Sequence, residues 1–222
     1  MNFYVSITTI KKYKEALDML LDSMPNEWKN KYIIVYQDET DEGFHVFDDG
    51  HIEVYLKNNI YDYGNWVGVG VLLENNVIPQ DSWFLFIHDT CRFINNNNIE
   101  LTYQFISTFH DTDVDIVWLC NNGQCNICLL RRQGVLYGYH IYKDIMFMER
   151  MDAIGYEWGH TQRLSPKSFP VEHKFIDIPT IYLGKKNIYS NNINRDVLLY
   201  ESINLEKYYY HTNHVVHHPC CP

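Results

Sequence analysis

The spacing of apolar residues changes twice near the start of the chain. Residues 3–8 alternate and are rich in β-branched and aromatic side chains, which predicts a strand. An apolar stripe follows at the i, i+3, i+4, i+7 spacing of an amphipathic helix: Tyr13, Ala16, Leu17, Leu20, Leu21 and Met24. Pro25 ends this helix, and residues 31–37 form a second apolar strand. The order predicts a parallel, right-handed β-α-β unit.

The same pattern continues through two further strands. Residues 52–56 predict a third, short strand. A helix is predicted over residues 65–75, where two interior glycines indicate close packing on the sheet. A continuous apolar run then begins at Trp83 and ends abruptly at His88 and Asp89, which predicts a strand buried on both faces of a parallel sheet. The first half therefore reads as half of an α/β nucleotide-binding fold.

The second half of the chain is less regular. Residues 115–119 and 126–131 are strand candidates, and residues 141–154 are the best helix candidate there. Residues 198–210 fit either a helix or a strand, and periodicity does not decide between them. Prolines and turns dominate the stretch between these segments. The acceptor side of any active site would have to come from this irregular half.

Length and charge restrict the class of protein. The 222 residues fit one compact domain, in which residues 1–90 form a nucleotide-binding half and residues 91–222 an acceptor-side half. A net charge of −10 argues against a general nucleic-acid binder, which needs a basic surface to neutralise phosphates. An acidic site that holds a divalent cation remains open.

The sequence shows no membrane span, signal segment or glycosylation acceptor, which predicts a soluble, cytoplasmic protein. No stretch approaches the roughly 20 apolar residues of a membrane span, and Met1 leads directly into the first strand without a signal segment. The chain has six cysteines and no Asn-x-Ser/Thr glycosylation acceptor. Reduced thiols are therefore expected.

Acidic residues follow three of the predicted parallel strands. Asp38 and Glu39 follow the second strand, Asp62 lies just beyond the third, and Asp89 follows the fourth. In an open α/β sheet, ligands bind outside the carboxyl ends of the strands, so these side chains are expected to line one crevice. Asp38 and Asp89 also have ordinary alternatives as turn or helix-capping residues.

These residues resemble a known family, the small GT-A-fold glycosyltransferases. The likeness rests on the early strand 4–9, the acidic end of the second strand and the end of the fourth strand, which reads His88-Asp89-Thr90. In that family the fourth-strand motif is Asp-x-Asp, and it holds a manganese or magnesium ion that bridges the diphosphate of a nucleotide sugar. Here one carboxylate of the motif remains.

The resemblance covers residues 3–150 and implies both a fold and a reaction. The fold is an α/β, Rossmann-type, mixed and mostly parallel sheet flanked by helices. The reaction transfers a hexose or deoxyhexose from a nucleotide-sugar donor to a glycan or glycoprotein acceptor. Such a transfer expels a doubly charged diphosphate, and a chain of net charge −10 meets that charge most readily with bound Mn²⁺ or Mg²⁺.

Metal ligation is assigned first to Asp89 and then to His88, whose imidazole nitrogen suits manganese. Neighbouring strand residues diverge, so His88 has an alternative place on the opposite face from Asp89. A late histidine, His211 or His214, is a further candidate that would complete the metal shell, as the resemblance implies for retaining members.

The resemblance places the nucleotide at the ends of the first and second strands. Carried onto this chain, those positions are Thr8, Thr9 and Asp38, with Asp62 as a further candidate. Asp38 would accept a hydrogen bond from a uracil or guanine ring nitrogen. Trp66 could stack on a ring, although a tryptophan in an apolar helix is more often part of the core.

The catalytic base of an inverting reaction would be a carboxylate near the acceptor hydroxyl. Glu149 resembles the late helical glutamate of related transferases, and Glu157 is the second candidate. A surface ion pair of Glu149 with Arg150 or Lys143 is the alternative.

Other readings stay open. Cys120, Cys125 and Cys128, with the histidine- and cysteine-rich tail, could hold a structural zinc or could simply be small buried thiols. A nucleotidyltransferase shares the opening, but residues 8–12 lack the glycine of a phosphate loop. A non-catalytic module that binds carbohydrate or a protein partner would account for the 18 tyrosines and five tryptophans.

Overall fold

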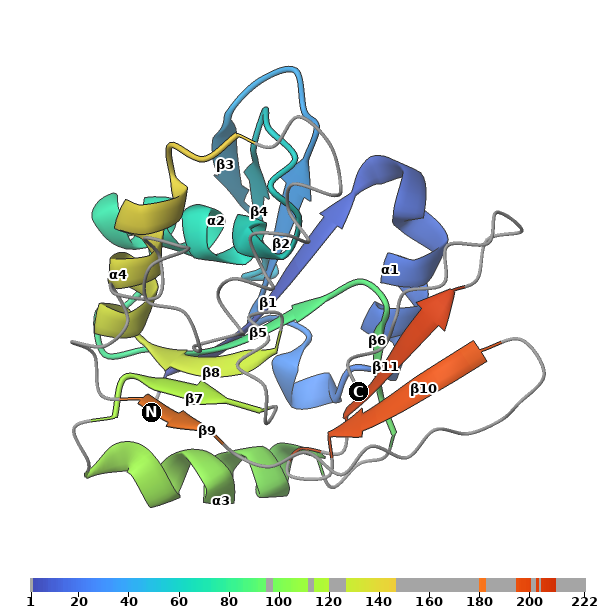
Figure 1. The fold of residues 1–222 in the computed structure, drawn as a ribbon, viewed down its shortest axis with the longest axis vertical. Coiled ribbons are helices and arrows are strands. Elements are labelled where there is room, and N and C mark those ends of the chain that lie inside the picture. Colours follow the sequence, from blue (N-terminus) through green and yellow to red (C-terminus); the bar gives the residue numbers. More distant parts are fainter. Residues whose placement is uncertain are drawn as a thin grey trace, which may run out of the picture.

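An eight-stranded sheet forms the centre of the molecule, with the order β3-β4-β2-β1-β5-β8-β7-β9 (Figure 1). The computed structural model describes residues 2–94, 98–111, 114–119, 127–146, 180–182, 195–200, 203 and 205–210. The strands of the sheet are β1 (Phe3–Ile10), β2 (Tyr32–Gln37), β3 (Gly43–Val46), β4 (Ile52–Tyr55), β5 (Trp83–His88), β7 (Ile116–Trp118), β8 (Cys128–Arg131) and β9 (Thr180–Tyr182).

Four helices and a second, smaller sheet accompany this sheet. The helices are α1 (Lys14–Ser23), α2 (Gly64–Glu74), α3 (Asn98–His110) and α4 (Arg132–Tyr142). Three single 3-10 turns are η1 (Lys11–Tyr13), η2 (Asn26–Trp28) and η3 (Tyr61–Tyr63). The second sheet has the order β10-β11-β6, with β6 (Cys91–Phe93), β10 (Arg195–Tyr200) and β11 (Leu205–Tyr210).

The main sheet is mixed and mostly parallel. β4, β2, β1 and β5 are parallel to one another, whereas β3 and β8 run antiparallel to their neighbours. β7 and β9 are parallel to each other and antiparallel to β8, which returns them to the direction of β5. The chain moves outward from β1 to β2 and β4, then crosses to β5 on the other side of β1. The strand order therefore reverses between β1 and β5, where an open α/β sheet forms its ligand crevice.

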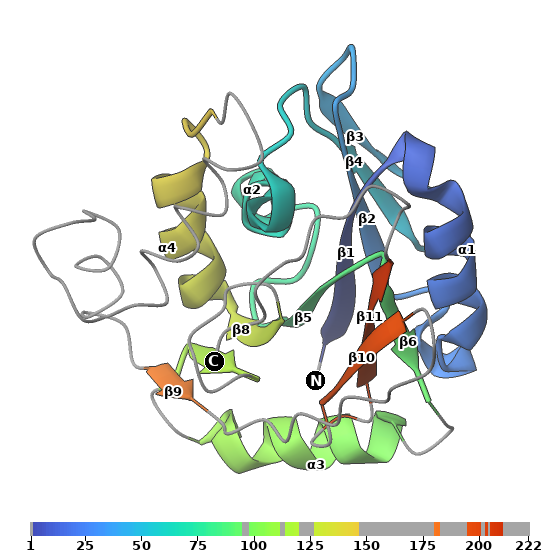
Figure 2. The same ribbon diagram turned by 45° about the vertical axis from the view of Figure 1, so that its right-hand side comes forward.

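Strand alternation assigns each helix to one face of the sheet. Phe3, Val5 and Ile7 of β1 pack in a core cluster with side chains of α1 and α3, and Phe84 and Phe86 of β5 pack in a second cluster with α2 and α4. Figure 2 shows the result, with α2 and α4 on one side of the sheet and α1 on the other. Both faces of the central strands are thus covered, which explains their continuous apolar sequence.

Glycines bring α2 and α4 close together. A Cβ added at Gly70 would lie 2.4 Å from Cγ of Tyr139, and one added at Gly138 would lie 2.0 Å from Cε3 of Trp66. Gly68 approaches Val35 of β2 in the same way, at 2.6 Å. The close packing on the sheet that the glycines of residues 65–75 predicted is therefore present, and it extends to the neighbouring helix.

The structure confirms most predicted elements of the first half and corrects several of the second. β1, α1, β2, β4, α2 and β5 all occur within a few residues of their predicted ranges, and β1 and β2 are parallel as expected. The predicted strands 115–119 and 126–131 correspond to β7 and β8. In its described part, the ambiguous stretch 198–210 contains strands, namely the end of β10 and all of β11.

The helix predicted over residues 141–154 is wrong for the described residues 143–146, because α4 begins at Arg132 and ends at Tyr142. Gly134 and Gly138 lower the helix propensity of residues 132–142. The segment is nevertheless helical, because α4 packs closely against α2. Several elements were not predicted, among them β3, β6, α3 and β9. β3 is exposed along its whole length and has no core-facing pattern, and α3 follows an asparagine-rich stretch that reads as a loop.

Within the part of the chain that the structure describes, no helix combines the length and the apolar character that crossing a bilayer requires.

The α2–α4 contact makes a prediction about stability. Replacing Gly138 by alanine should lower the free energy of unfolding by about 1–3 kcal/mol, because the new methyl group collides with the Trp66 ring. Helix propensity alone predicts the opposite sign, a gain of about 1 kcal/mol. Urea unfolding of Gly138→Ala, with the exposed α4 change Gln133→Ala as control, measures the difference. Equal stability of the two variants would contradict the close contact.

Candidate functional site

A side-chain hydrogen bond joins the ends of β1 and β5, where the strand order reverses. Thr9 Oγ1 donates to Asp89 Oδ2 at 2.6 Å, and the backbone N–H of Asp89 donates to the carbonyl of Thr8 at 3.3 Å. Thr8 and His88 are register partners in the parallel ladder. Asp89 lies in the turn between β5 and β6, so it stands where the chain leaves the main sheet for the second sheet.

Asp89 is a carboxylate held in an unfavourable environment. The side chain is 7% exposed, and burial raises its pKa to about 6. The negative charge of Asp62 raises this pKa further, while hydrogen bonds from Thr9 and from the Thr90 backbone oppose the shift. A buried carboxylate at the crevice edge of an α/β sheet is a functional-site candidate, because a cation would relieve the cost of its charge.

One ring nitrogen of His88 contacts a hydroxyl group, and the other has no hydrogen-bond partner among the described residues. Its Nδ1 lies 2.7 Å from the hydroxyl of Thr90, and within the described residues its buried Nε2 has no hydrogen-bond partner. Burial lowers the pKa of His88 to about 3, with a further lowering from the positive charge of Lys207. The imidazole is therefore neutral at physiological pH. A neutral imidazole oriented through one nitrogen can offer the other to a ligand.

The side chains of His88 and Asp89 diverge. Phe84 and Phe86 of β5 face α2 and α4, which by alternation places His88 on that side. Ile87 faces α1 and α3, and the hydrogen bond to Thr9 keeps Asp89 on the same side as Ile87. This geometry favours separate contacts of the two side chains over joint ligation of one ion.

Thr8, a predicted nucleotide contact, accepts a hydrogen bond from another side chain of the fold. Nε2 of Gln37 donates to Thr8 Oγ1 at 2.7 Å and to the carbonyl of Tyr61 at 2.8 Å. Oε1 of Gln37 accepts the N–H of Ile60 at 2.7 Å. Gly64 approaches so closely that a Cβ there would lie 2.7 Å from Thr8 Oγ1. Gln37 and Thr8 thus lock the loop before α2 onto the sheet edge, a role that sequence reasoning missed for Gln37.

Asp38 and Asp62 lie at the same edge of the sheet but differ in their surroundings. Asp38 is exposed, has a positive φ of 62°, and accepts a hydrogen bond from Asn59 Nδ2 at 3.1 Å. Asp62 is partly buried in η3, and its charge acts on the pKa values of both His88 and Asp89. The structure therefore brings Asp62 near the His88-Asp89 motif and leaves the Asp38 carboxylate at the surface beyond β2.

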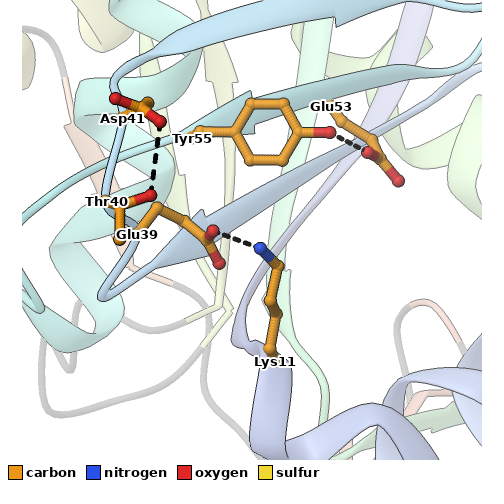
Figure 3. A network of polar contacts seen from close by, with 6 residues as sticks. All are labelled: Lys11, Glu39, Thr40, Asp41, Glu53 and Tyr55. Atoms are coloured by element: carbon orange, nitrogen blue, oxygen red, sulfur yellow. Dashed lines mark hydrogen bonds and ion pairs between the residues drawn. The ribbon is translucent and has the colours of Figure 1, made fainter.

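Glu39, the second member of the acidic pair after β2, forms an ion pair with a lysine of the same chain. Figure 3 shows its ion pair with Lys11, which joins the segment after β1 to the segment after β2. The same view shows Tyr55 of β4 donating its hydroxyl hydrogen bond to Glu53. Lys11 is largely exposed, and Tyr55 and Glu53 both belong to β4.

Trp66 belongs to the core. Its side chain is fully buried, its ring meets Phe86 edge-on at 5.3 Å between centroids, and Gly138 lies against it. This is the core position that the sequence analysis gave as the alternative to stacking on a nucleobase.

Asn65, one residue earlier, was not predicted as important. It donates to the carbonyl of Ile87 at 2.7 Å and accepts from Ser6 Oγ at 2.9 Å, so it binds α2 to β1 and β5 directly beneath the motif.

Several predicted residues lie outside the described part of the chain. These are Glu149 and Glu157, predicted as catalytic, His211 and His214, predicted as metal ligands, and Cys120 and Cys125 of the possible zinc site. Cys91 and Cys128 are described, and both are buried.

Within the described residues, no group of three or more His, Cys, Asp or Glu side chains is arranged to hold a metal ion. Near the motif, the described donors include the Asp89 and Asp62 carboxylates and the buried Nε2 of His88, and His88 and Asp89 lie on different faces. Magnesium-type cations are commonly held by one or two carboxylates together with substrate phosphates. Asp89 fits that mode of binding as a single protein ligand.

Comparison with protein-family models and with curated proteins finds no match to this sequence. Function must therefore be inferred from the fold and the side chains.

The raised pKa of Asp89 predicts a pH-dependent stability. The folded state binds a proton more tightly than the unfolded state, whose aspartate pKa is near 3.8, so stability should fall as the pH rises from about 4 to about 6 and stay low above that. Asp89→Asn keeps the shape and removes the charge. In EDTA, we expect this variant to match the wild type at pH 4 and to exceed it at pH 8 by on the order of 2 kcal/mol.

Urea unfolding at several pH values measures this difference. Asp22→Asn, at an exposed position of α1, controls for the loss of one negative charge from an acidic chain. A stability difference between Asp89→Asn and wild type that stays constant from pH 4 to pH 8 would show that burial does not perturb Asp89.

Proposed function

We propose that the chain is a GT-A-type glycosyltransferase that transfers a hexose or deoxyhexose from a nucleotide-diphosphate sugar to a glycan or glycoprotein acceptor. The observation that carries this proposal is the buried Asp89, which Thr9 holds at the reversal of strand order. A mixed, mostly parallel sheet flanked by helices is the fold that the resemblance implies, and the main sheet agrees with it at that level.

Asp89 would hold a divalent cation, Mn²⁺ or Mg²⁺, which supplies positive charge to the departing diphosphate. The carboxylate is suited to this because burial makes its charged form costly without a cation, while the hydrogen bond from Thr9 fixes its direction. Asp62 adds negative potential at the same place. His88, neutral and open at Nε2, would donate to or accept from the sugar-phosphate part of the donor.

The nucleoside would lie beyond β1 and β2. Asp38 offers an exposed carboxylate there, and Asn59 holds it in one orientation. A carboxylate at this position would accept a hydrogen bond from the ring N–H of uracil or guanine. Glu149 and Glu157 remain the proposed candidates for the base that deprotonates the acceptor hydroxyl.

A thermal-shift panel tests the proposal. Uridine, guanosine and thymidine diphosphate sugars would each be added with Mn²⁺ or with EDTA, alongside the nucleoside triphosphates. One nucleotide sugar with Mn²⁺ should raise the melting temperature by about 5–10 °C at 100-fold excess over its dissociation constant. Stronger protection by a nucleoside triphosphate would instead indicate a nucleotidyltransferase.

Asp89→Ala should lose the Mn²⁺-dependent part of this shift and keep its fold, because the residue lies beyond the end of a strand. Asp22→Ala, at an exposed α1 position, should keep the full shift. If Asp89→Ala unfolds while the folded fraction retains donor affinity, the site is excluded. Mn²⁺-dependent release of free nucleoside diphosphate from the nucleotide sugar separates a transferase from a binding module.

Metal dependence should itself vary with pH. Protons and Mn²⁺ compete for Asp89, whose pKa is about 6, so removal of the metal should cost more stability at pH 8 than at pH 5. Melting temperatures with Mn²⁺ and with EDTA at the two pH values provide the measurement. The same loss at both values would place the cation elsewhere.

A further inference from the structure

β3 lies at one edge of the main sheet and leaves one of its sides open. Among the described residues, β4 is the only strand that pairs with it, and all of Gly43–Val46 is exposed. A Cβ added at Gly43 would meet no heavy atom within 4 Å. Figures 1 and 2 both show β3 at the margin of the sheet, next to β4. The side of β3 that faces away from β4 is therefore accessible to solvent.

The register of the β3–β4 pair shows which backbone groups point to this open side. Just beyond β3, the N–H of Phe47 donates to the carbonyl of His51 at 3.0 Å. Hydrogen-bonded and non-hydrogen-bonded pairs alternate along an antiparallel ladder, so His45, two residues earlier, also bonds to β4. Phe44 and Val46 occupy the alternate positions. Their N–H and C=O groups are therefore directed away from β4.

Phe44 and Val46 also have exposed apolar side chains, with exposed fractions of 39% and 49%. They lie opposite Val54 and Ile52 of β4, which are buried in the core cluster on the α2 side. Directly opposite side chains share a face of the sheet, so Phe44 and Val46 continue this apolar face to the edge. A partner strand with apolar residues at alternate positions would cover both.

The sequence around β3 is strongly acidic. Residues 32–56 contain seven Asp and Glu residues and no Lys or Arg, in a chain of net charge −10. Asp41 and Glu42 precede β3, Asp48 and Asp49 follow it, and all four are exposed. Among the described residues, none of these four carboxylates forms an ion pair with Lys or Arg. Both ends of the open strand therefore present negative charge to a partner.

These charges disfavour a second copy of the chain as that partner. If two copies of β3 paired antiparallel with their apolar residues opposite one another, Glu42 would lie opposite Asp48. In the same register, Asp41 would lie opposite Asp49, and the two-fold symmetry would repeat both contacts. Like charges directly opposite one another destabilise strand pairing. Charges beside an edge strand are also a common protection against self-association.

We propose that the open side of β3 binds an extended, basic peptide segment of a partner protein, which adds a strand to the main sheet. Its backbone would bond to that of Phe44 and Val46, and its apolar side chains at alternate positions would pack beside theirs. Lys or Arg residues at both ends of the segment would meet the acidic residues that flank β3. This inference does not depend on the proposed glycosyltransferase function.

Amide hydrogen exchange tests the backbone pairing. The probe is the peptide acetyl-Lys-Lys-Val-Thr-Val-Lys-Lys-amide, whose valines can lie beside Phe44 and Val46. Exchange at Phe44 and Val46 should be fast in the free protein and at least about tenfold slower with saturating peptide, because their N–H groups gain a partner. His45, already bonded to β4, should change little and is the internal control. Unchanged exchange at Phe44 and Val46 would overturn the proposal.

Methylated probes separate strand pairing from simple attraction of opposite charges. Methyl groups on both valine nitrogens remove the N–H groups that would bond to β3, so binding should weaken at least about tenfold in calorimetric titrations. A methyl group on the threonine nitrogen, which would point away from β3, should cost less than about threefold. Equal affinity of the two methylated peptides, or no binding of the unmodified peptide at about 1 mM, would contradict the assignment.

The acidic ends are tested by a double variant, Glu42→Gln with Asp48→Asn. It should bind the basic peptide about threefold to tenfold more weakly than the wild type, the range expected for two exposed ion pairs. Glu15→Gln with Asp22→Asn, at exposed positions of α1, makes the same change in net charge and should leave the affinity within about twofold. An equal loss in both double variants would reduce the effect to net charge and exclude the site.

Sedimentation of the protein alone tests the other occupant. A monomer, or a dimer that Val46→Lys leaves intact, agrees with an edge reserved for a basic peptide. A dimer that Val46→Lys dissociates would instead assign the open side of β3 to a second copy of the chain and overturn the proposal.

Discussion

A carboxylate buried at the reversal of strand order is the constraint on which the candidate site depends. Asp89 follows the end of β5, and the Thr9 hydroxyl at the end of the paired strand β1 holds its carboxylate. Burial makes its charged form unfavourable, with a pKa of about 6. A fold selected for stability alone would place a neutral or apolar side chain there. Residues that conflict with local packing rules are characteristic of binding and catalytic sites.

Polar contacts on the α2 side of the sheet keep that carboxylate in position. Asn65 bonds to both β1 and β5 one residue before the motif, and Gln37 binds Thr8 to the loop that leads into α2. Gly64 lets this loop approach the strand ends closely. Two separate sets of hydrogen bonds, one through Asn65 and one through Gln37, therefore support the strand ends. A site on a rigid support loses little conformational entropy when it binds a ligand.

The sequence predicted the strands and helices that carry the candidate site better than the side-chain contacts at the site. Periodicity identified β1 and α1, and continuous apolar runs identified β2 and β5. The parallel order of the strands was enough to place Asp38, Asp62 and Asp89 at one edge. Periodicity does not report which side chains meet across that edge. The bond between Thr9 and Asp89 depends on the pairing of β1 with β5, and these strands are far apart in the sequence.

The limits of prediction were greatest where tertiary contacts override local signals. The glycines that allow α2 and α4 to pack closely also lower the helix propensity of α4, so its sequence does not predict a helix. Lys207 could not be recognised as core-facing, because residues 198–210 fitted a helix as well as a strand, and only the pairing of β11 with β6 assigns its direction. The corresponding signal in the sequence is a lysine two residues after a leucine, which is informative only once the segment is known to be a strand.

Burial and neighbouring charge both oppose a second carboxylate beside Asp89. Burial raises the pKa of Asp89, and the charge of Asp62 raises it further. A second carboxylate beside Asp89 would raise the cost of burial further, because like charges in a low-dielectric site repel. Asp89 lies in the turn that joins the main sheet to the second sheet, so in the proposed transferase a single cation held there would be the contact between this carboxylate and the donor diphosphate.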